Sequence, residues 1–340
     1  MFFSILIPAY NCEKYIDGCV SSIINQKCQD FELIIVNDGS KDGTADKCKA
    51  WAEKYPEQVH FISKENSGAY LTRRLLLREA KGEYVLFIDA DDNYIGNDAL
   101  AHIKQKIEET DADLLFFDAT SDLSAMKKMF DYPYQNGEIF ENGRIAEIYR
   151  LFVNTKKFQH LWNKAFRRSL IDYELPDEPF AFRMLRDGVY QIVPILSKAD
   201  KIVYLDEILY FYRTDNENSV SHSFKIDFYY SMVALHSRIL ECSKEWRHKN
   251  SETDDYVKAG CTADMCISAI KARDLPKETP MSKSEYIRMI GSEPLFRQQY
   301  TQKHLDSFRK PIAWALYHKQ YWIVSLVSSL VGAGKRVAKQ

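Results

Sequence analysis

Short apolar runs alternate with amphipathic segments along the first part of the chain. Four runs rich in branched and aromatic residues predict strands, at 3–7, 31–36, 59–63 and 84–88. Three segments between them carry apolar residues at helical spacing and predict helices, at 15–26, 45–55 and 69–80. This alternation predicts an α/β fold with a doubly wound, mostly parallel sheet and helices on both faces.

The pattern weakens after the fourth strand and then changes. A helix at 99–109 and a strand at 114–118 are followed by a poorly patterned stretch, 120–145, as expected for loops. Helices at 143–154 and 181–197 and short strands at 202–205 and 209–213 are expected next. After about residue 224, the apolar residues recur only at helical spacing. We therefore expect one α/β domain over 1–223 and a C-terminal helical region over 224–340.

Polar residues follow each early strand, where open α/β sheets bind their ligands. Tyr10, after the first strand, offers a ring that can stack on a base, and Asn11 can fix the loop. Asp38, after the second strand, can accept the imide N–H of uracil or thymine. Asn66 follows the third strand, and Arg73, about a helix turn further, can pair with phosphate. Turn, cap and exposed-helix roles are the ordinary alternatives.

An acidic cluster, Asp89-Ala90-Asp91-Asp92, follows the fourth strand. Clustered carboxylates repel one another, and a hard divalent cation relieves that repulsion. Mg²⁺ or Mn²⁺ at such a site can also carry a substrate diphosphate. The alternative is an acidic turn, since Asp is common in turns. Together the four loops predict a pocket for a nucleoside diphosphate.

Composition removes several other classes of protein. Lys and Arg total 46 against 48 Asp and Glu, so no basic field points to nucleic acid. The seven cysteines form no CxxC pair, which argues for a reducing compartment and against a disulfide framework or structural zinc. The opening apolar run is short and meets Pro8, so we expect no signal peptide.

The segment 321–332 is apolar and uncharged, and Lys335, Arg336 and Lys339 follow it. It is too short to cross a bilayer as a helix. One interpretation is a membrane-interface helix near 312–335, which the Trp and the basic residues favour. The other is a helix docked on the core or on a second subunit.

The ordered motifs resemble the family 2 glycosyltransferases of bacterial surface-polysaccharide synthesis, which are inverting enzymes with the GT-A fold. The match is close over 2–120 and weaker to about 222. It is carried by Ile5–Asn11, Ile34–Thr44, Glu65–Gly68, Ala80–Tyr84 and Phe87–Asp92, and more weakly by Leu161–Phe166, Tyr210–Arg213 and Ser219–Ser221.

The resemblance implies a role for individual residues. Asp91 would bind the metal, Mn²⁺ or Mg²⁺, and His222 would add a metal or diphosphate contact. Arg73 and Asp89 would approach the ribose or phosphates. The full nucleotide-sugar set would be Pro8, Ala9, Tyr10, Asn11, Asp38, Asn66, Arg73, Asp89 and Ala90.

An inverting transfer also needs a base that deprotonates the acceptor hydroxyl. Relatives place it in a Glu-Asp pair at the start of a helix, and Arg186-Asp187 is the best match here. The Asp is kept, but Arg186 replaces the Glu, which is a first departure from the family pattern. We therefore predict Asp187 as the catalytic base, with Glu174, Asp177 and Glu178 as competitors. A second departure from the family pattern is Arg73-Arg74, where Asn commonly follows the Arg, with Leu76 in place of a Gly.

The resulting prediction is a metal-dependent, inverting hexosyl- or N-acetylhexosaminyltransferase that uses a nucleotide sugar, with a UDP-linked donor as the favoured choice. Its acceptor would be a hydroxyl of a glycan or lipid-linked saccharide. The protein would be cytoplasmic and could be peripheral on the inner face of the cell membrane. A nucleotidyltransferase that forms a sugar nucleotide is the first alternative, although Pro8-Ala9-Tyr10-Asn11 is not a Gly-rich phosphate loop. A non-catalytic nucleotide- or glycan-binding module is the second.

Overall fold

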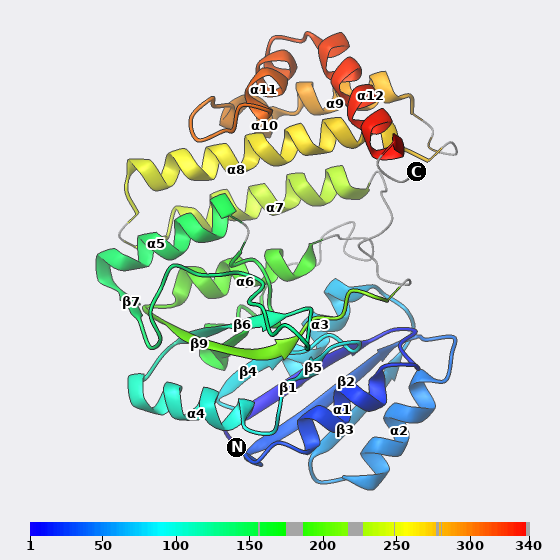
Figure 1. The fold of residues 1–340 in the computed structure, drawn as a ribbon, viewed down its shortest axis with the longest axis vertical. Coiled ribbons are helices and arrows are strands. Elements are labelled where there is room, and N and C mark those ends of the chain that lie inside the picture. Colours follow the sequence, from blue (N-terminus) through cyan, green and yellow to red (C-terminus); the bar gives the residue numbers. More distant parts are fainter. Residues whose placement is uncertain are drawn as a thin grey trace. The chain divides into compact units, whose positions relative to one another are not determined.

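A computed structural model describes residues 1–155, 157–174, 186–216, 227–247, 249–276, 279 and 281–337. The chain forms two compact units (Figure 1). Unit 1 comprises Met1–Ile145 and Gln159–Glu217, and unit 2 comprises Ala146–Phe158 and Asn218–Gln340. The predicted boundary at 223/224 lies outside the described residues.

Within the described residues, nine strands of unit 1 form a single sheet. They are β1 (Phe3–Ala9), β2 (Phe31–Asp38), β3 (Val59–Lys64), β4 (Tyr84–Phe87), β5 (Asn93–Tyr94), β6 (Leu114–Thr120), β7 (Ile139–Glu141), β8 (Lys164–Arg167) and β9 (Lys201–Phe211). The strand order is β3-β2-β1-β4-β8-β6-β9-β5, and β7 pairs with β9.

The first four strands run parallel, so their carboxyl ends meet at one edge of the sheet. Ile5 of β1 lies opposite Leu33 of β2 and Leu86 of β4, and all three side chains are buried. Continuous burial is expected of parallel strands that are covered on both faces. β8 is antiparallel to both β4 and β6, while β9 is parallel to β6. The predicted fold class is therefore confirmed.

Helices cover both faces of this sheet. α1 (Ile16–Ile24) and α2 (Thr44–Lys54) cover one face, and α3 (Ala69–Glu79) covers the other (Figure 1). α6 (Asp187–Lys198) packs against α3, where the rings of Tyr70 and Tyr190 meet edge to face at 5.6 Å. α4 (Ala99–Thr110) is the remaining α-helix among the described residues of the unit. The α3–α6 contact matters for function because it brings the first turn of α6 toward the ligand loops.

Two elements differ from the sequence prediction. The predicted pair of strands at 202–205 and 209–213 is wrong: β9 is continuous, and the polar Asp206-Glu207 that interrupts the apolar pattern lies within it. Two shifts in its register with β6, one on each side of Asp118, accommodate the extra residues. The predicted helix at 143–154 is a 3₁₀ turn (Asn142–Arg144), α5 (Ile145–Arg150) and a π-helical turn (Leu151–Thr155).

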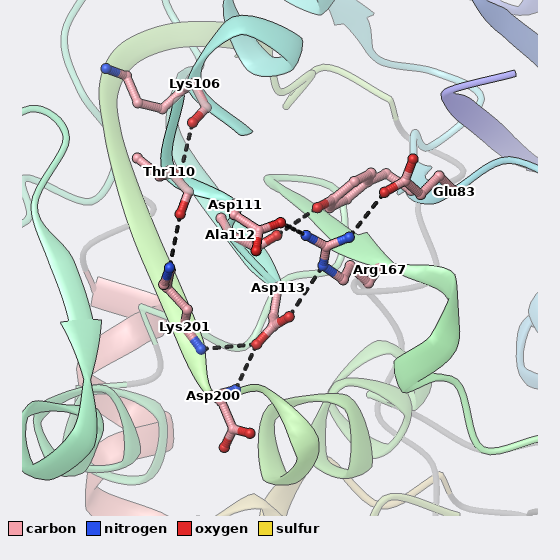
Figure 2. Close-up of polar contacts among 10 residues, drawn as sticks. Glu83, Lys106, Thr110, Asp111, Ala112, Asp113, Arg167, Asp200 and Lys201 are labelled. Atoms are coloured by element: carbon pink, nitrogen blue, oxygen red, sulfur yellow. Dashed lines mark hydrogen bonds and ion pairs between the residues drawn. The ribbon is translucent and has the colours of Figure 1, made fainter. Parts of the chain in front are cut away.

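A polar network ties the strands together at the sheet edge opposite the ligand loops (Figure 2). Arg167, at the end of β8, donates to Glu83 (2.9 Å), to Asp111 and to Asp113 Oδ1 (3.2 Å). Asp113 Oδ2 in turn accepts the backbone N–H groups of Asp200 (2.9 Å) and Lys201 (3.0 Å). The Arg167 guanidinium thus fixes β8 to the starts of β4 and β6, and Asp113 extends the network to the start of β9.

Unit 2 is helical, as predicted for the C-terminal region. Its further helices are α7 (Asp227–Ser243), α8 (Ser251–Ile270), α9 (Lys283–Ser292), α10 (Pro294–Gln299), α11 (Arg309–Tyr317) and α12 (Tyr321–Val337), with a 3₁₀ turn at Lys271–Asp274. α8 lies at the centre and contacts each of the other five. Stacking of Tyr149 on Trp246 (4.3 Å) joins the α5 segment to this bundle. Among the described residues, every helix is too short or too polar to cross a membrane.

Candidate active site

The loop after β1 is fixed to the loop after β2 by Asn11. The Asn11 N–H donates to Ser40 Oγ (3.0 Å), and the Lys41 N–H donates to Asn11 Oδ1 (2.8 Å). Asn11 has a φ of 48°, a left-handed conformation that Asn tolerates better than most residues. Tyr10 is left 49% exposed at the sheet edge, so its ring is free to take a stacking partner.

Asp38 joins the second and third ligand loops. Its carboxylate is buried and accepts the backbone N–H groups of Ser67 (2.8 Å) and Gly68 (2.9 Å), together with the Lys64 ammonium. Asn66 donates its amide to the Asp38 carbonyl (2.8 Å). A carboxylate has about four acceptor positions, so a base N–H would share an oxygen with these donors. The geometry therefore holds Asp38 still without saturating it.

Arg73, on α3, bridges two predicted site residues that are far apart in sequence. Its Nη2 donates to Asp89 Oδ1 (2.8 Å) and its Nη1 to Asp187 Oδ2 (2.6 Å). Burial alone would lower the pKa of Arg73, but Asp187 and Asp89 outweigh that effect and hold its pKa above the ordinary value. The guanidinium is thus a fixed cation between the fourth ligand loop and the start of α6.

Asp187 is the first residue of α6 and is mostly buried. Both donors to its side chain reach one oxygen: Arg73 at 2.6 Å and Gln191 Nε2 at 3.2 Å contact Oδ2. Among the described residues, Oδ1 receives no hydrogen bond. The carboxylate is therefore oriented through one oxygen, while the other can still accept a proton.

The carboxylates of the acidic cluster have different surroundings. Asp92 is buried and accepts Tyr210 Oη–H and the Arg213 N–H, both at 2.7 Å. Burial raises the pKa of Asp92 to about 8, and the charges of Asp89 and Asp91 add to the rise. Asp92 therefore anchors the end of β9 to the fourth loop, and each of its oxygens already accepts a donor from the protein.

Asp91 is the carboxylate of the cluster best suited to a cation. It is partly buried and accepts the Asn216 amide (2.7 Å). Burial raises the pKa of Asp91, and Asp89 adds to the rise, so a nearby positive charge would stabilise its ionised form. Among the described residues, no group of three or more His, Cys, Asp or Glu is arranged to hold a metal. One carboxylate still fits Mg²⁺ or Mn²⁺, because such ions take further oxygens from substrate phosphates and water.

The remaining predicted residues fall into three groups. Ala9 and Ala90 are buried, so only their backbone could meet a nucleotide, and Pro8 is partly buried at the end of β1. Glu174 is exposed. His222, Asp177 and Glu178 lie outside the described residues, and so does the 219–221 motif.

Sequence reasoning alone did not identify Lys64, Gln191 and Asn216, which contact Asp38, Asp187 and Asp91 respectively. Lys64 and Asn216 act on residues from other elements or loops, so no local motif marks them. Gln191 lies one helical turn after Asp187 on α6, and this spacing could have indicated the contact. The two departures from the family pattern also find partners: Arg74 donates to the backbone carbonyls of residues 172 and 173, and Arg186 donates to the Gln159 side chain. Arg74 thus anchors backbone beside the site, and Arg73 alone bridges the carboxylates.

Known proteins share this sequence pattern and fold. The model of the family described as "Glycosyl transferase family 2" matches residues 4–192, more than half of the chain. Glycosyltransferase GlyA of Streptococcus pneumoniae is 28% identical over 217 residues, which is 62% of this chain and 30% of GlyA. The uncharacterized glycosyltransferase EpsJ of Bacillus subtilis is 26% identical over 224 residues, 64% of this chain and 62% of EpsJ. The chain thus spans less than two thirds of these two relatives.

The third comparison is with TarS of Staphylococcus aureus, a poly(ribitol-phosphate) β-N-acetylglucosaminyltransferase that is 28% identical over 267 residues, 76% of this chain and 44% of TarS. The crystal structure of TarS 1-349 in complex with UDP-GlcNAc superposes with a TM-score of 0.70 at 21% identity, over 98% of this chain and 92% of that one. This likeness establishes the GT-A fold.

Proposed function

The chain belongs to glycosyl transferase family 2, and on that basis we propose that it is an inverting glycosyltransferase that moves a sugar from a UDP-linked donor to an acceptor hydroxyl. The observation that carries this proposal is the Arg73 bridge. It joins Asp89, in the predicted donor loop, to Asp187, the predicted base, through contacts of 2.8 and 2.6 Å. Donor-side and acceptor-side chemistry would therefore meet at one point.

The first two loops would hold the base of the nucleotide. Tyr10 offers its exposed ring for stacking, and Asp38 offers a fixed carboxylate to an imide N–H. An imide N–H flanked by two carbonyls occurs in uracil and thymine but not in guanine, which favours a UDP- or dTDP-linked donor over a GDP-linked one. The fold shared with TarS, whose structure was solved in complex with UDP-GlcNAc, supports UDP among these.

Asp91 would hold Mn²⁺ or Mg²⁺ together with the diphosphate of the donor. A cation there would neutralise charge on the departing nucleoside diphosphate. Arg73 contacts Asp89, two residues before Asp91, and would be a second positive charge near the diphosphate. A guanidinium suits this role because its geometry matches phosphate oxygens. His222 would be a further candidate contact for the metal or the diphosphate.

Asp187 would act as the base. Its Oδ1 would take the proton of the acceptor hydroxyl as that oxygen attacks the anomeric carbon and the bond to the UDP oxygen breaks. Attack from the face opposite the leaving group inverts the anomeric configuration. Arg73 and Gln191 hold Oδ2, so the carboxylate keeps its orientation while Oδ1 accepts the proton.

The acceptor would be a hydroxyl of a glycan or a lipid-linked saccharide in surface polysaccharide synthesis. The name of TarS, which describes transfer of N-acetylglucosamine to poly(ribitol-phosphate), supports this class of acceptor and an N-acetylhexosaminyl or hexosyl donor. The nucleotide-sugar donor would place the reaction in the cytoplasm. A lipid-linked acceptor would place it at the inner face of the cell membrane.

A donor screen tests the proposal. The chain is incubated with UDP-, GDP- and dTDP-sugars, with and without Mn²⁺, and nucleotide release is measured. We expect Mn²⁺-dependent release of UDP and a product whose anomeric configuration, read by NMR, is opposite to that of the donor. Release of pyrophosphate from UTP, with formation of a sugar nucleotide, would contradict the proposal.

Matched variants separate catalysis from binding alone. Asp91→Asn should abolish UDP release, whereas Asp46→Asn, an exposed change in the first turn of α2, should leave it unchanged. Equal activity of the two variants would show that the metal assignment is wrong. Tight UDP binding without release from any donor would instead indicate a non-catalytic nucleotide-binding module.

A further inference from the structure

Helix α12 of unit 2 docks through one face and leaves an apolar stripe on another. Val324 and Ser328 are buried, and Ser328 Oγ donates to the backbone carbonyl at the end of α8 (2.7 Å). The stripe consists of Trp322, Leu326 and Leu330, which are 66%, 54% and 62% exposed. Residues four apart lie on the same side of a helix, so these three form one continuous surface. Such large apolar side chains in a row are unusual on a protein surface that meets only water.

A second tryptophan, Trp314, lies in the last turn of α11, close to the turn that joins α11 to α12. Trp314 is also largely exposed, and its ring lies 4.8 Å from that of His318. Gln320 donates to the His318 carbonyl (3.4 Å) and accepts the Trp322 indole N–H (3.2 Å). This chain of contacts places both indoles beside the same turn. We call Trp314, Trp322, Leu326 and Leu330 the α11–α12 patch.

The sequence around the patch is strongly basic. Within 301–340 the chain has seven Lys or Arg residues and one acidic residue, whereas the whole chain has 46 and 48. Lys303 and Arg309 form ion pairs with Asp255 and Asp306. Lys310 and Lys319 are exposed and flank α11 at its two ends. Exposed apolar side chains and uncompensated positive charge therefore occur together.

We propose that the α11–α12 patch binds the surface of an anionic lipid bilayer. Leu326, Leu330 and the indole rings would enter the boundary between headgroups and acyl chains, where Trp is favoured. Lys310 and Lys319 would lie among the anionic headgroups. Both contributions are needed, because a weak apolar anchor alone gives only marginal membrane binding. An added electrostatic attraction to the headgroups makes that binding stable. α12 would lie along the surface and not across it.

A second copy of this chain is the other occupant to consider, and charge disfavours it. In a symmetric dimer the same surface meets itself, so the basic segment of one copy would face that of the other. Like charges at close range repel, whereas anionic headgroups attract them. The bilayer is therefore the occupant that complements both the apolar and the charged parts of the surface. This inference goes beyond sugar transfer and does not depend on the identity of the donor.

Vesicle sedimentation with the full chain tests the proposal. The vesicles contain equal parts of phosphatidylglycerol and phosphatidylcholine, or phosphatidylcholine alone. We expect binding to the anionic vesicles that weakens with added salt, and much weaker binding to the neutral ones. The variant W322Q/L326Q/L330Q should bind anionic vesicles at least about tenfold more weakly. The control L123Q/M126Q, which removes exposed apolar side chains from unit 1, should bind as the wild type does.

Lys310→Gln and Lys319→Gln provide a second, independent test that leaves the packing of α12 unchanged. Each should weaken binding to anionic vesicles about fivefold at low salt, because each removes one attraction to the headgroups. Light scattering then addresses the dimer. A wild-type dimer that becomes monomeric in W322Q/L326Q/L330Q, with vesicle binding unchanged, would overturn the proposal, as would unchanged binding in all the patch variants.

Discussion

The ion-pair bridge at Arg73 offers a stability prediction that can be worked out from its surroundings. Arg73→Met keeps the length of the side chain and removes the charge. The Arg73 side chain is 14% exposed, and its partners Asp187 and Asp89 are 11% and 30% exposed. Removal of the guanidinium leaves Asp187 nearly buried without its cation, while Asp89 can regain water.

The magnitude follows from those two environments. Loss of the partner of a buried ion typically costs about 3–5 kcal/mol, whereas an exposed pair contributes about 0–1 kcal/mol. The Asp187 contact belongs near the first class and the Asp89 contact nearer the second. We therefore expect Arg73→Met to lower the free energy of unfolding by about 3 kcal/mol. Arg73→Lys should lower the free energy of unfolding by less than Arg73→Met does. It should still cause a loss, because an ammonium cannot bridge both carboxylates in the same geometry.

Urea unfolding followed by tryptophan fluorescence gives the required free energies. Arg78→Met, an exposed change on the same helix, is the matched control and should cost less than about 0.5 kcal/mol. In an Asp187→Asn background, the Arg73→Met change should cost at least about 1 kcal/mol less, since the neutral amide no longer needs a cation. A loss for Arg73→Met as small as that for Arg78→Met would refute the reasoning about the buried bridge.

Two further predictions concern Asp92 and the network at the opposite sheet edge. Burial raises the pKa of Asp92 to about 8 from an ordinary value of 3.8, so its contribution to stability is present at low pH and is lost as pH rises toward 8. As pH rises from 5 to 9, the stability of Asp92→Asn should therefore increase relative to that of the wild type. Urea unfolding with a chelator present measures this difference. A difference that does not change with pH would contradict the prediction. Arg167→Met removes the cation shared by three carboxylates and should lower the free energy of unfolding by about 2 kcal/mol without changing UDP binding. Lys27→Met, which breaks the exposed Lys27–Asp98 pair, should cost less than about 1 kcal/mol in the same assay, and equal losses would show that the network adds no stability.

The first four strands and their loops were predictable because local pattern determines them. Each strand is a short apolar run, and the polar residue that ends it must lie at the carboxyl edge of a parallel sheet. The meeting of Asp38 with the loop at Asn66 follows from that topology and is confirmed. The apolar run of each strand and the polar residue that follows it therefore suffice to predict the order of the four ligand loops.

Other features depend on contacts that no local signal encodes. β9 is one strand although Asp206 and Glu207 interrupt its apolar pattern. Asp206 pairs with Lys128 and Glu207 forms a hydrogen bond with His102, and both partners are distant in sequence. The contact of Arg73 with Asp187 joins residues 114 positions apart, and spacing along the chain does not reveal it. The resemblance assigned the metal to Asp91 and gave Asp92 no role. The burial of Asp92 against Tyr210 depends on a contact between residues 118 positions apart, which the sequence does not reveal.

The helix at 321–337 shows why the two sequence interpretations of the tail could not be separated by pattern. Its docked face and its exposed face are both apolar. Val324 is buried, while Trp322, two residues earlier, is largely exposed. A run without charged residues gives no sign of which side meets the protein. The structure therefore supports docking of one face and leaves membrane contact through the other as a proposal.

The most direct test of the proposed mechanism is the rate of sugar transfer by Asp187→Asn, measured beside its affinity for UDP. The amide preserves the shape of the side chain and cannot accept the proton of the acceptor hydroxyl. If Asp187 is the base, UDP affinity in the presence of Mn²⁺ should stay close to that of the wild type, while the transfer rate should fall by about 10²–10⁴-fold. A near-normal transfer rate in a folded variant would contradict the account and assign the base to another carboxylate.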